Sequence, residues 1–157
     1  EVICVNGEGC MQMNLQELQT VLTNQLPIKI FVINNQGYHS IRQTQNNLFK
    51  EHCKIGIGPE SGDLSFPDFS KLSEAFGYTY LEAHSNAQMK KMVDQALKID
   101  GAVFCEIFVS AEQNFEPKSA TKRLEDGTLV SPPLEDLAPF LPREEIIKNM
   151  FIPVIEE

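Results

Sequence analysis

Two short stretches decide the fold: VICVNGEGCMQMN at residues 2–14 and IKIFVINNQGY at residues 28–38. Each begins with a continuous, largely apolar run, which is typical of a strand buried on both faces of a sheet. The first run stops at Gly7-Glu8-Gly9, and the second stops at Asn34-Asn35-Gln36-Gly37. The sequence therefore predicts two strands, one ending in a carboxylate between glycines and the other in a pair of carboxamides.

Helices and strands alternate along the first 110 residues. Leucines recur at intervals of three and four from Leu15 to Leu26, which predicts a helix that starts at Met13 and stops at Pro27. The other predicted elements are a helix at 40–49, a loop at 54–66, a helix at 68–76 capped by Asp68 and ended by Gly77, a strand at 78–81, a helix at 85–99 and a strand at 102–109. This alternation predicts an α/β fold, with a parallel sheet flanked by helices on both faces.

The character of the chain changes after Ser110. Residues 112–142 contain five prolines and many charges without any regular period, so residues 111–157 are expected to form an irregular, extended C-terminal tail or lid. A short helix is expected at 143–150. The leucines spread along the tail favour docking onto protein, and a partly disordered extension is the alternative. The chain opens directly on a buried strand, so we interpret residues 1–110 as part of a longer domain.

Composition excludes several classes of function. The net charge of -9 disfavours binding to nucleic acid or to an anionic membrane surface. No apolar run is long enough to cross a membrane. The four cysteines lie far apart, without any C-x-x-C pair, and Cys4 and Cys105 lie in apolar runs as small core residues. A reduced, cytoplasmic protein is the expectation.

The acid between two glycines calls for a chemical explanation. In open α/β sheets, ligands bind beyond the carboxyl ends of the strands, and the helix that follows directs N–H groups and its positive end at an anion such as a diphosphate. Glu8 alone would repel that anion, whereas a divalent cation would bridge the two. Asn35 can supply an amide oxygen and Gly37 a backbone carbonyl. The pattern therefore predicts a Mg²⁺ site that holds a diphosphate.

The same residues carry a resemblance to a known family. GEGCMQMNLQEL at 7–18, followed by IKIFVINNQGYHSIRQTQ at 28–45, closely resembles the diphosphate-binding domain of thiamine-diphosphate-dependent enzymes, nearest to the acetolactate synthase group. Gly9 and Asn34 are separated by 24 residues, 10 to 33, which fits the spacing of that family's Gly-Asp-Gly and Asn-Asn motif. The resemblance covers roughly residues 1–110.

The resemblance implies a set of site residues. Glu8 takes the place of the family's metal-binding Asp, and the other ligands are the side chain of Asn35 and the carbonyl of Gly37. The backbone N–H groups of Gly9 and Cys10 match positions that hold the diphosphate. The residues implied for cofactor binding are Gly7, Gly9, Cys10, Asn35 and Tyr38.

The resemblance also implies an activity. The full-length protein would use thiamine diphosphate and Mg²⁺ to decarboxylate 2-keto acids and transfer the acyl anion, as a homodimer or homotetramer with a shared active site. The activating Glu is expected in a missing domain, so no catalytic residue is assigned here and this fragment alone is expected to be inactive. FAD is possible in the full-length protein without support in this chain. The alternative is a diverged, non-catalytic α/β domain that has lost efficient cofactor binding.

Polar residues near the motif leave alternatives open. His39 is the histidine closest to the cofactor loop and is a candidate to face a substrate, but a surface position at a helix start is favoured. Arg42 fits either a bidentate contact with a substrate carboxylate or a solvated helix face. His52 and Cys53 are disfavoured as a metal pair, because adjacent side chains point apart. Ser40 and Thr44 stand where acetolactate synthases usually have Met and Trp, which puts true acetolactate synthesis in doubt.

Overall fold

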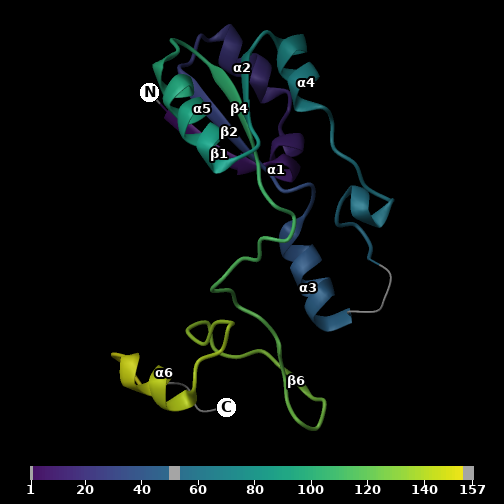
Figure 1. Cartoon of the computed structure of the whole chain (residues 1–157), viewed down its shortest axis with the longest axis vertical. Helices are drawn as coiled ribbons and strands as arrows, with labels where there is room; N and C mark the ends of the chain where they lie inside the picture. Colours follow the sequence, from purple (N-terminus) through teal and green to yellow (C-terminus); the bar gives the residue numbers. More distant parts are fainter. Residues whose placement is uncertain (1, 50–53, 154–157) are drawn as a thin grey trace. The chain divides into compact units, whose positions relative to one another are not determined.

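The computed structural model of the chain describes residues 2–49 and 54–153 (Figure 1). They form two compact units, which divide between Gln113 and Asn114. The first unit is built on a four-stranded sheet in the order β1-β2-β4-β3, with every neighbouring pair parallel. Its strands are β1 (Val2–Gly7), β2 (Ile28–Asn34), β3 (Thr79–Ala83) and β4 (Val103–Phe108).

Helices connect these strands as crossovers, which parallel pairing requires. They are α1 (Glu8–Met13), α2 (Glu17–Thr23), α3 (His39–Phe49), the 3₁₀ turn η1 (Pro59–Ser61), α4 (Phe69–Phe76) and α5 (Asn86–Lys98). In Figure 1, α5 lies on one face of the sheet, whereas α2 and α4 lie on the other, and α3 starts beyond the carboxyl ends of the strands.

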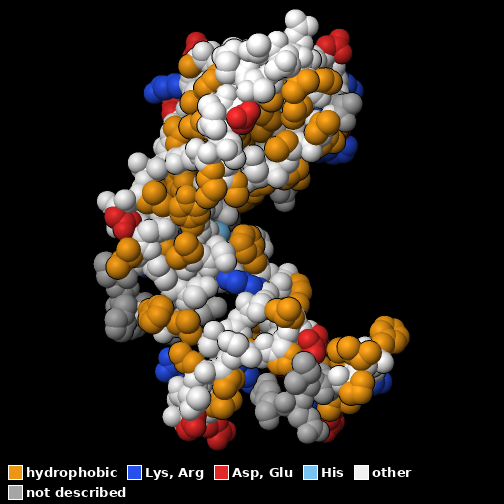
Figure 2. Space-filling view, turned by 180° about the vertical axis from the view of Figure 1, so that it is seen from behind, with side chains coloured by type: hydrophobic (Ala, Val, Ile, Leu, Met, Phe, Trp, Pro, Cys, Tyr) orange, Lys and Arg blue, Asp and Glu red, His pale blue; other side chains and the backbone are white. Residues whose placement is uncertain are grey.

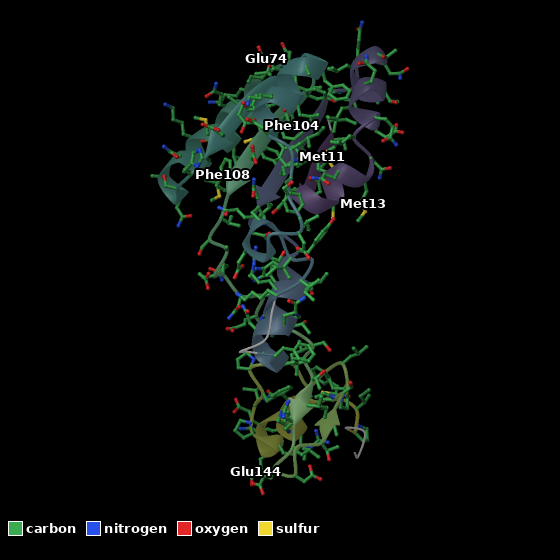
Figure 3. All side chains as sticks on the ribbon, turned by 90° about the vertical axis from the view of Figure 1, so that its right-hand side faces the viewer. Met11, Met13, Glu74, Phe104, Phe108 and Glu144 are labelled. Carbon is green, nitrogen blue, oxygen red and sulfur yellow. The ribbon has the colours of Figure 1, made fainter. Side chains whose placement is uncertain are left out.

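The core consists of two apolar layers, one on each face of the sheet. Ile30 and Val32 of β2 face the layer under α1, α2 and α4, whereas Phe31 faces the layer under α5. Met11 of α1 is 6% exposed and Met13 is 69% exposed, and Figure 3 shows the two on opposite sides of that helix. Successive strand residues point to opposite faces, so β2 is buried from both sides, as predicted. The prediction that the first strand is buried on both faces is wrong: β1 lies at the edge of the sheet, and Val2, Ile3 and Val5 are 56%, 56% and 63% exposed. The predicted parallel sheet flanked by helices on both faces is confirmed.

The predicted helix between the first two strands is wrong in its bounds. The chain becomes helical at Glu8, directly after β1, and breaks at Asn14–Gln16 before α2 continues to Thr23. Leu15 packs against the core from the break itself. The leucine spacing therefore reflects one buried surface that two short helices and their link share.

Capping residues predicted the ends of the later helices correctly. The side chain of Asp68 accepts a hydrogen bond from the Lys71 amide at 3.1 Å, and Gly77 ends α4 in the left-handed conformation with φ of 92°. Ser85 caps α5 in the same manner through the Gln88 amide. The predicted helices at 40–49, 68–76 and 85–99 each correspond to an observed helix, and η1 lies inside the predicted loop at 54–66.

The second unit is largely irregular. It contains the two-residue strands β5 (Lys122–Arg123) and β6 (Leu129–Val130), which pair antiparallel, and α6 (Arg143–Asn149). Ile146 of α6 is buried, and Lys122 lies over the Phe140 ring at 5.4 Å. No helix among the residues that the structure describes is long and apolar enough to span a bilayer.

Candidate active site: the carboxyl ends of β1 and β2

The site forms where β1 and β2 end side by side. Gly7 pairs with Ile33 in the parallel register, so the turns that follow the two strands meet. Glu8, the first residue of α1, is 1% exposed and points toward the turn after β2. Its Oε1 accepts a hydrogen bond from the Gly37 amide at 2.5 Å, and its Oε2 lies 3.4 Å from the Asn35 amide. The two sequence motifs are therefore in direct contact.

Burial dominates the electrostatics of Glu8. Removal from water raises the pKa of its carboxyl group. The backbone amides of Glu8, Gly37 and Asn35 and the positive charge of Arg42 oppose that rise. The carboxylate is thus surrounded by donors yet has no cationic side chain bonded to it among the residues that the structure describes.

The side-chain amide of Asn35 completes a cluster of three groups. One of its two terminal atoms lies 2.6 Å from the Gly37 carbonyl oxygen and 3.2 Å from Oε1 of Glu8. As nitrogen, this atom donates to both neighbours; as oxygen, it brings three oxygens together, which a cation would hold. Adjacent ligands of an octahedral Mg²⁺, each about 2.1 Å from the ion, lie about 3 Å apart. With the Asn35 oxygen turned to this position, the chemistry of the three groups and the two distances from that atom fit Mg²⁺, whereas with the nitrogen there the amide bridges the carboxylate and the carbonyl.

At two positions of this site, neighbouring atoms lie so close to the backbone that only glycine fits. A Cβ on Gly37, whose φ is 154°, would lie 1.8 Å from the Ile57 carbonyl oxygen. A Cβ on Gly9 would lie 2.3 Å from Cε1 of Tyr38, because that ring packs directly on the start of α1. The Tyr38 amide donates to the Ile57 carbonyl at 2.8 Å, which fixes the turn after β2 against the loop at 57–58.

Arg42 of α3 also supports the turn, and its predicted position on a solvated helix face is wrong. The residue is 3% exposed, and its Nη1 and Nη2 donate to the carbonyl oxygens of Asn35 and Gln36 at 3.0 and 2.7 Å. Its Nε donates to Glu60 at 3.1 Å. Arg42 is therefore not solvated, since three of its donors hold backbone and a carboxylate, whereas its contact with a substrate carboxylate stays a prediction.

His39 also differs from the favoured prediction. It is 4% exposed, with Nδ1 3.3 Å from Nη1 of Arg42, so it is not a surface residue. The buried positions of Arg42 and His39 could not be predicted from the sequence. One reason is that Glu60, which pairs with Arg42, belongs to a loop that follows 18 residues later. The one local signal for their contact is that Arg42 follows His39 by three residues, which places the two side chains on one face of the helix. This spacing does not by itself indicate that the two residues are buried.

The remaining predicted residues are placed as follows. Gly7 is the N-cap of α1, and the N–H groups of the first turn, at Glu8, Gly9 and Cys10, have no partner within a helix. Cys10 is exposed, Cys4 is half-buried and Cys105 is buried, and all three are free thiols. His52 and Cys53 lie outside the described residues.

The site differs from a thiolate or histidine metal centre. In the described part of the chain, no three His, Cys, Asp or Glu side chains form a cluster that could hold a metal. A cation here would depend on one carboxylate with neutral oxygens and a ligand's own phosphates, which is the usual environment of Mg²⁺. On the face drawn in Figure 2, Lys and Arg side chains are scattered rather than gathered into a basic surface.

Comparisons with known proteins agree on one family. Residues 1–107 match the model of the thiamine pyrophosphate enzyme C-terminal TPP binding domain. The acetolactate synthase large subunit of Porphyra purpurea is 35% identical over 119 residues, 76% of this chain and 20% of that protein. The acetolactate synthase isozyme 2 large subunit of Escherichia coli K12 is 33% identical over 116 residues, with 74% and 20% covered.

A solved structure shares the fold. The thiamine diphosphate-dependent 4-hydroxybenzoylformate decarboxylase of Rhodococcus jostii RHA1 superposes with a TM-score of 0.61 at 20% identity, over 73% of this chain and 20% of that one. The present chain thus spans about a fifth of the length of the relatives that it matches.

Proposed function

Because the chain belongs to the thiamine pyrophosphate enzymes, of which it represents the C-terminal TPP-binding domain, we propose that its site holds Mg²⁺ and a diphosphate. The observation that carries the proposal is that two groups converge on one terminal atom of the Asn35 side chain. The Gly37 carbonyl oxygen lies 2.6 Å from that atom, and Oε1 of Glu8 lies 3.2 Å from it. These three groups would be the protein's ligands for the metal. Residues 1–110 would then form a partial diphosphate-binding domain, and residues 111–157 a tail or lid.

Each residue of the site has a binding or positioning role in this proposal. Glu8 supplies the negative charge for the metal, and the N–H groups of Gly9 and Cys10 donate to the diphosphate at the start of α1. Gly7 and Gly9 let the backbone approach the ligand, and Tyr38 keeps α1 and the turn after β2 in register. When bound, thiamine diphosphate supplies the nucleophilic carbon for decarboxylation of a 2-keto acid and transfer of its acyl unit.

The activity belongs to the whole protein in this proposal. The named relatives support an acetolactate synthase-like protein. We propose for it a transferase or lyase activity on 2-keto acids, in an assembly of two or four subunits that share active sites. The activating Glu would come from a domain other than this one. The free thiols of Cys4, Cys10 and Cys105 support a cytoplasmic location.

A second candidate is a diverged domain that folds without binding the cofactor efficiently. The longer Glu8 side chain in the place of the family's Asp favours it, because Mg²⁺ demands near-ideal octahedral geometry. The two candidates differ in one measurable property, namely the affinity for thiamine diphosphate in the presence of Mg²⁺.

Calorimetric titration of the full-length protein with thiamine diphosphate, with and without Mg²⁺, tests the proposal. We expect Mg²⁺-dependent binding that Glu8→Ala and Asn35→Ala each weaken by about tenfold or more, as loss of a metal contact does. Glu74→Ala, which removes an exposed carboxylate from α4 (Figure 3), is the matched control and should bind normally. Absence of Mg²⁺-dependent binding in the unaltered protein would establish the second candidate. Full affinity in Glu8→Ala would instead refute the assignment of Glu8 as a metal ligand.

A further inference from the structure

A second buried carboxylate lies near the same edge of the sheet. Glu106 sits in the middle of β4, the most apolar strand, and is 3% exposed. It shares one face of the sheet with Phe104 and Phe108, which Figure 3 labels on either side of it along the strand. Its register partners are Val32 of β2 and Glu82 of β3. A charge in such a place needs hydrogen-bond donors, since burial without them is costly.

Two side chains donate to this carboxylate. The Tyr80 hydroxyl donates to Oε2 of Glu106 at 2.5 Å, and Nδ2 of Asn34 donates to Oε1 at 2.6 Å. The Asn34 contact fixes the direction of that amide, because a carboxylate accepts from NH₂ and cannot donate to the amide oxygen. Oδ1 of Asn34 must therefore face the opposite way, and there it accepts from the Gln36 amide at 2.9 Å.

The bond to Gln36 holds a strained turn. Gln36 adopts a φ of 59°, in the left-handed region that residues with a side chain rarely occupy. An Asn side chain that accepts from the amide two residues later stabilises such a turn. The next amide along the chain, that of Gly37, donates to Glu8. Four hydrogen bonds thus connect Tyr80 and Glu106 of neighbouring strands, through Asn34 and the turn, to the carboxylate of Glu8.

We propose that Glu106 is a positioning residue for the turn at 35–37, acting through the side chain of Asn34. Its carboxylate selects the amide orientation of Asn34 that supports Gln36, and so presents Asn35 and Gly37 to Glu8. Arg42 holds the carbonyl groups of the same turn, whereas Glu106 controls its amide side. The functional meaning of this inference rests on the proposed Mg²⁺ and diphosphate site, but the structural link can be measured without any ligand.

Three substitutions of Glu106 separate the possible roles. Glu106→Gln keeps the length and an acceptor oxygen for Asn34, and its NH₂ can donate to Tyr80, whose hydroxyl then turns to Glu82 at 3.2 Å. Glu106→Asp keeps the charge but shortens the side chain by one methylene, and Glu106→Leu keeps the size without an acceptor. A positioning role predicts that only the Gln variant is tolerated. A role through charge predicts that only Asp is, and a role through packing favours Leu.

Amide hydrogen exchange of the full chain, followed by NMR, measures the turn directly. We expect the amides of Gln36 and Gly37 to exchange about tenfold faster in Glu106→Asp and Glu106→Leu, relative to amides of α5, and within about threefold of the unaltered rate in Glu106→Gln. Tyr78→Phe is the matched control. It removes a buried hydroxyl from the same face, 2.9 Å from the Leu18 carbonyl, and should leave the turn unchanged.

The outcomes decide between these roles. Unchanged exchange at Gln36 and Gly37 in Glu106→Asp, or exchange in Glu106→Gln as fast as in Glu106→Asp, would overturn the inference. This comparison stands even where Glu106→Leu fails to fold.

Calorimetry with Mg²⁺ and thiamine diphosphate then adds the functional test. Weaker binding in Glu106→Asp but not in Glu106→Gln supports a role in the site, and equal affinity in the two contradicts it. If the unaltered protein does not bind, the proposed function fails, whereas the exchange data still decide whether Glu106 holds the turn.

Discussion

The contact between Gly9 and Tyr38 allows a prediction whose sign depends on the background. A methyl group added at Gly9 would lie 2.3, 3.0 and 3.1 Å from three atoms of the Tyr38 ring. Carbon atoms pack at about 3.5–4.0 Å, so the ring or α1 must move by about 1 Å or more. Overpacking of this kind costs about 1–3 kcal/mol. Alanine is otherwise better than glycine in a helix by about 1 kcal/mol.

We therefore expect Gly9→Ala to destabilise the protein by about 0–2 kcal/mol when Tyr38 is present, and to stabilise it by up to about 1 kcal/mol in a Tyr38→Ala background. Urea unfolding followed by circular dichroism of all four proteins gives the coupling energy, for which we expect about 1–3 kcal/mol. Gly7→Ala is the control, because a Cβ there meets nothing nearer than the Ile33 carbonyl at 3.8 Å. An equal effect of Gly9→Ala in both backgrounds would refute the reasoning.

Two further predictions concern buried polar groups. Burial raises the pKa of Cys105 to about 11. Its thiol should therefore resist iodoacetamide at pH 8 in the native protein, whereas the exposed Cys10 should react. Peptide mass spectrometry distinguishes the two sites, and labelling of Cys105 before Cys10 would contradict the fold. Lys29 is 2% exposed and donates to the carbonyl oxygens of Ile99 and Gly101. Lys29→Met should therefore lower the free energy of unfolding, measured by urea denaturation, by about 1–3 kcal/mol. The same change at an exposed lysine of α5 should alter the free energy of unfolding by less than about 0.5 kcal/mol.

The sequence predicted the layers of the fold because each rests on a local pattern. Continuous apolar runs marked the inner strands β2 and β4, and single residues such as Asp68, Gly77 and Ser85 marked helix ends. The same pattern at residues 2–5 predicted burial wrongly, because β1 lies at the edge of the sheet. The sequence did not predict the break at Asn14–Gln16, since the apolar spacing continues through it. Periodicity reports which residues face the core, and a link between two helices can face the core as well.

The sequence also predicted one part of the candidate site and not another. The two motifs could be placed together in advance, because parallel strands bring their carboxyl ends to one edge of the sheet. The role of Glu106 could not be predicted, since it lies 72 residues from Asn34 along the chain. Arg42 follows the turn closely, but its ion-pair partner Glu60 lies 18 residues later, so its burial could not be predicted either. A signal for Glu106 and Lys29 was present nevertheless. A charged residue inside an apolar strand has to find buried partners, and both residues do.

In the proposed site, Glu8 takes the place that the resemblance gives to an Asp, and the position of its backbone bears on whether the longer side chain fits. Glu8 is the first residue of α1, and β1 ends one residue earlier. From this position the longer side chain reaches the turn after β2, where Oε1 accepts from the Gly37 amide at 2.5 Å and lies 3.2 Å from the Asn35 amide atom. The longer side chain therefore keeps the carboxylate in contact with the Gly37 amide and the Asn35 side chain, both of which belong to the proposed site.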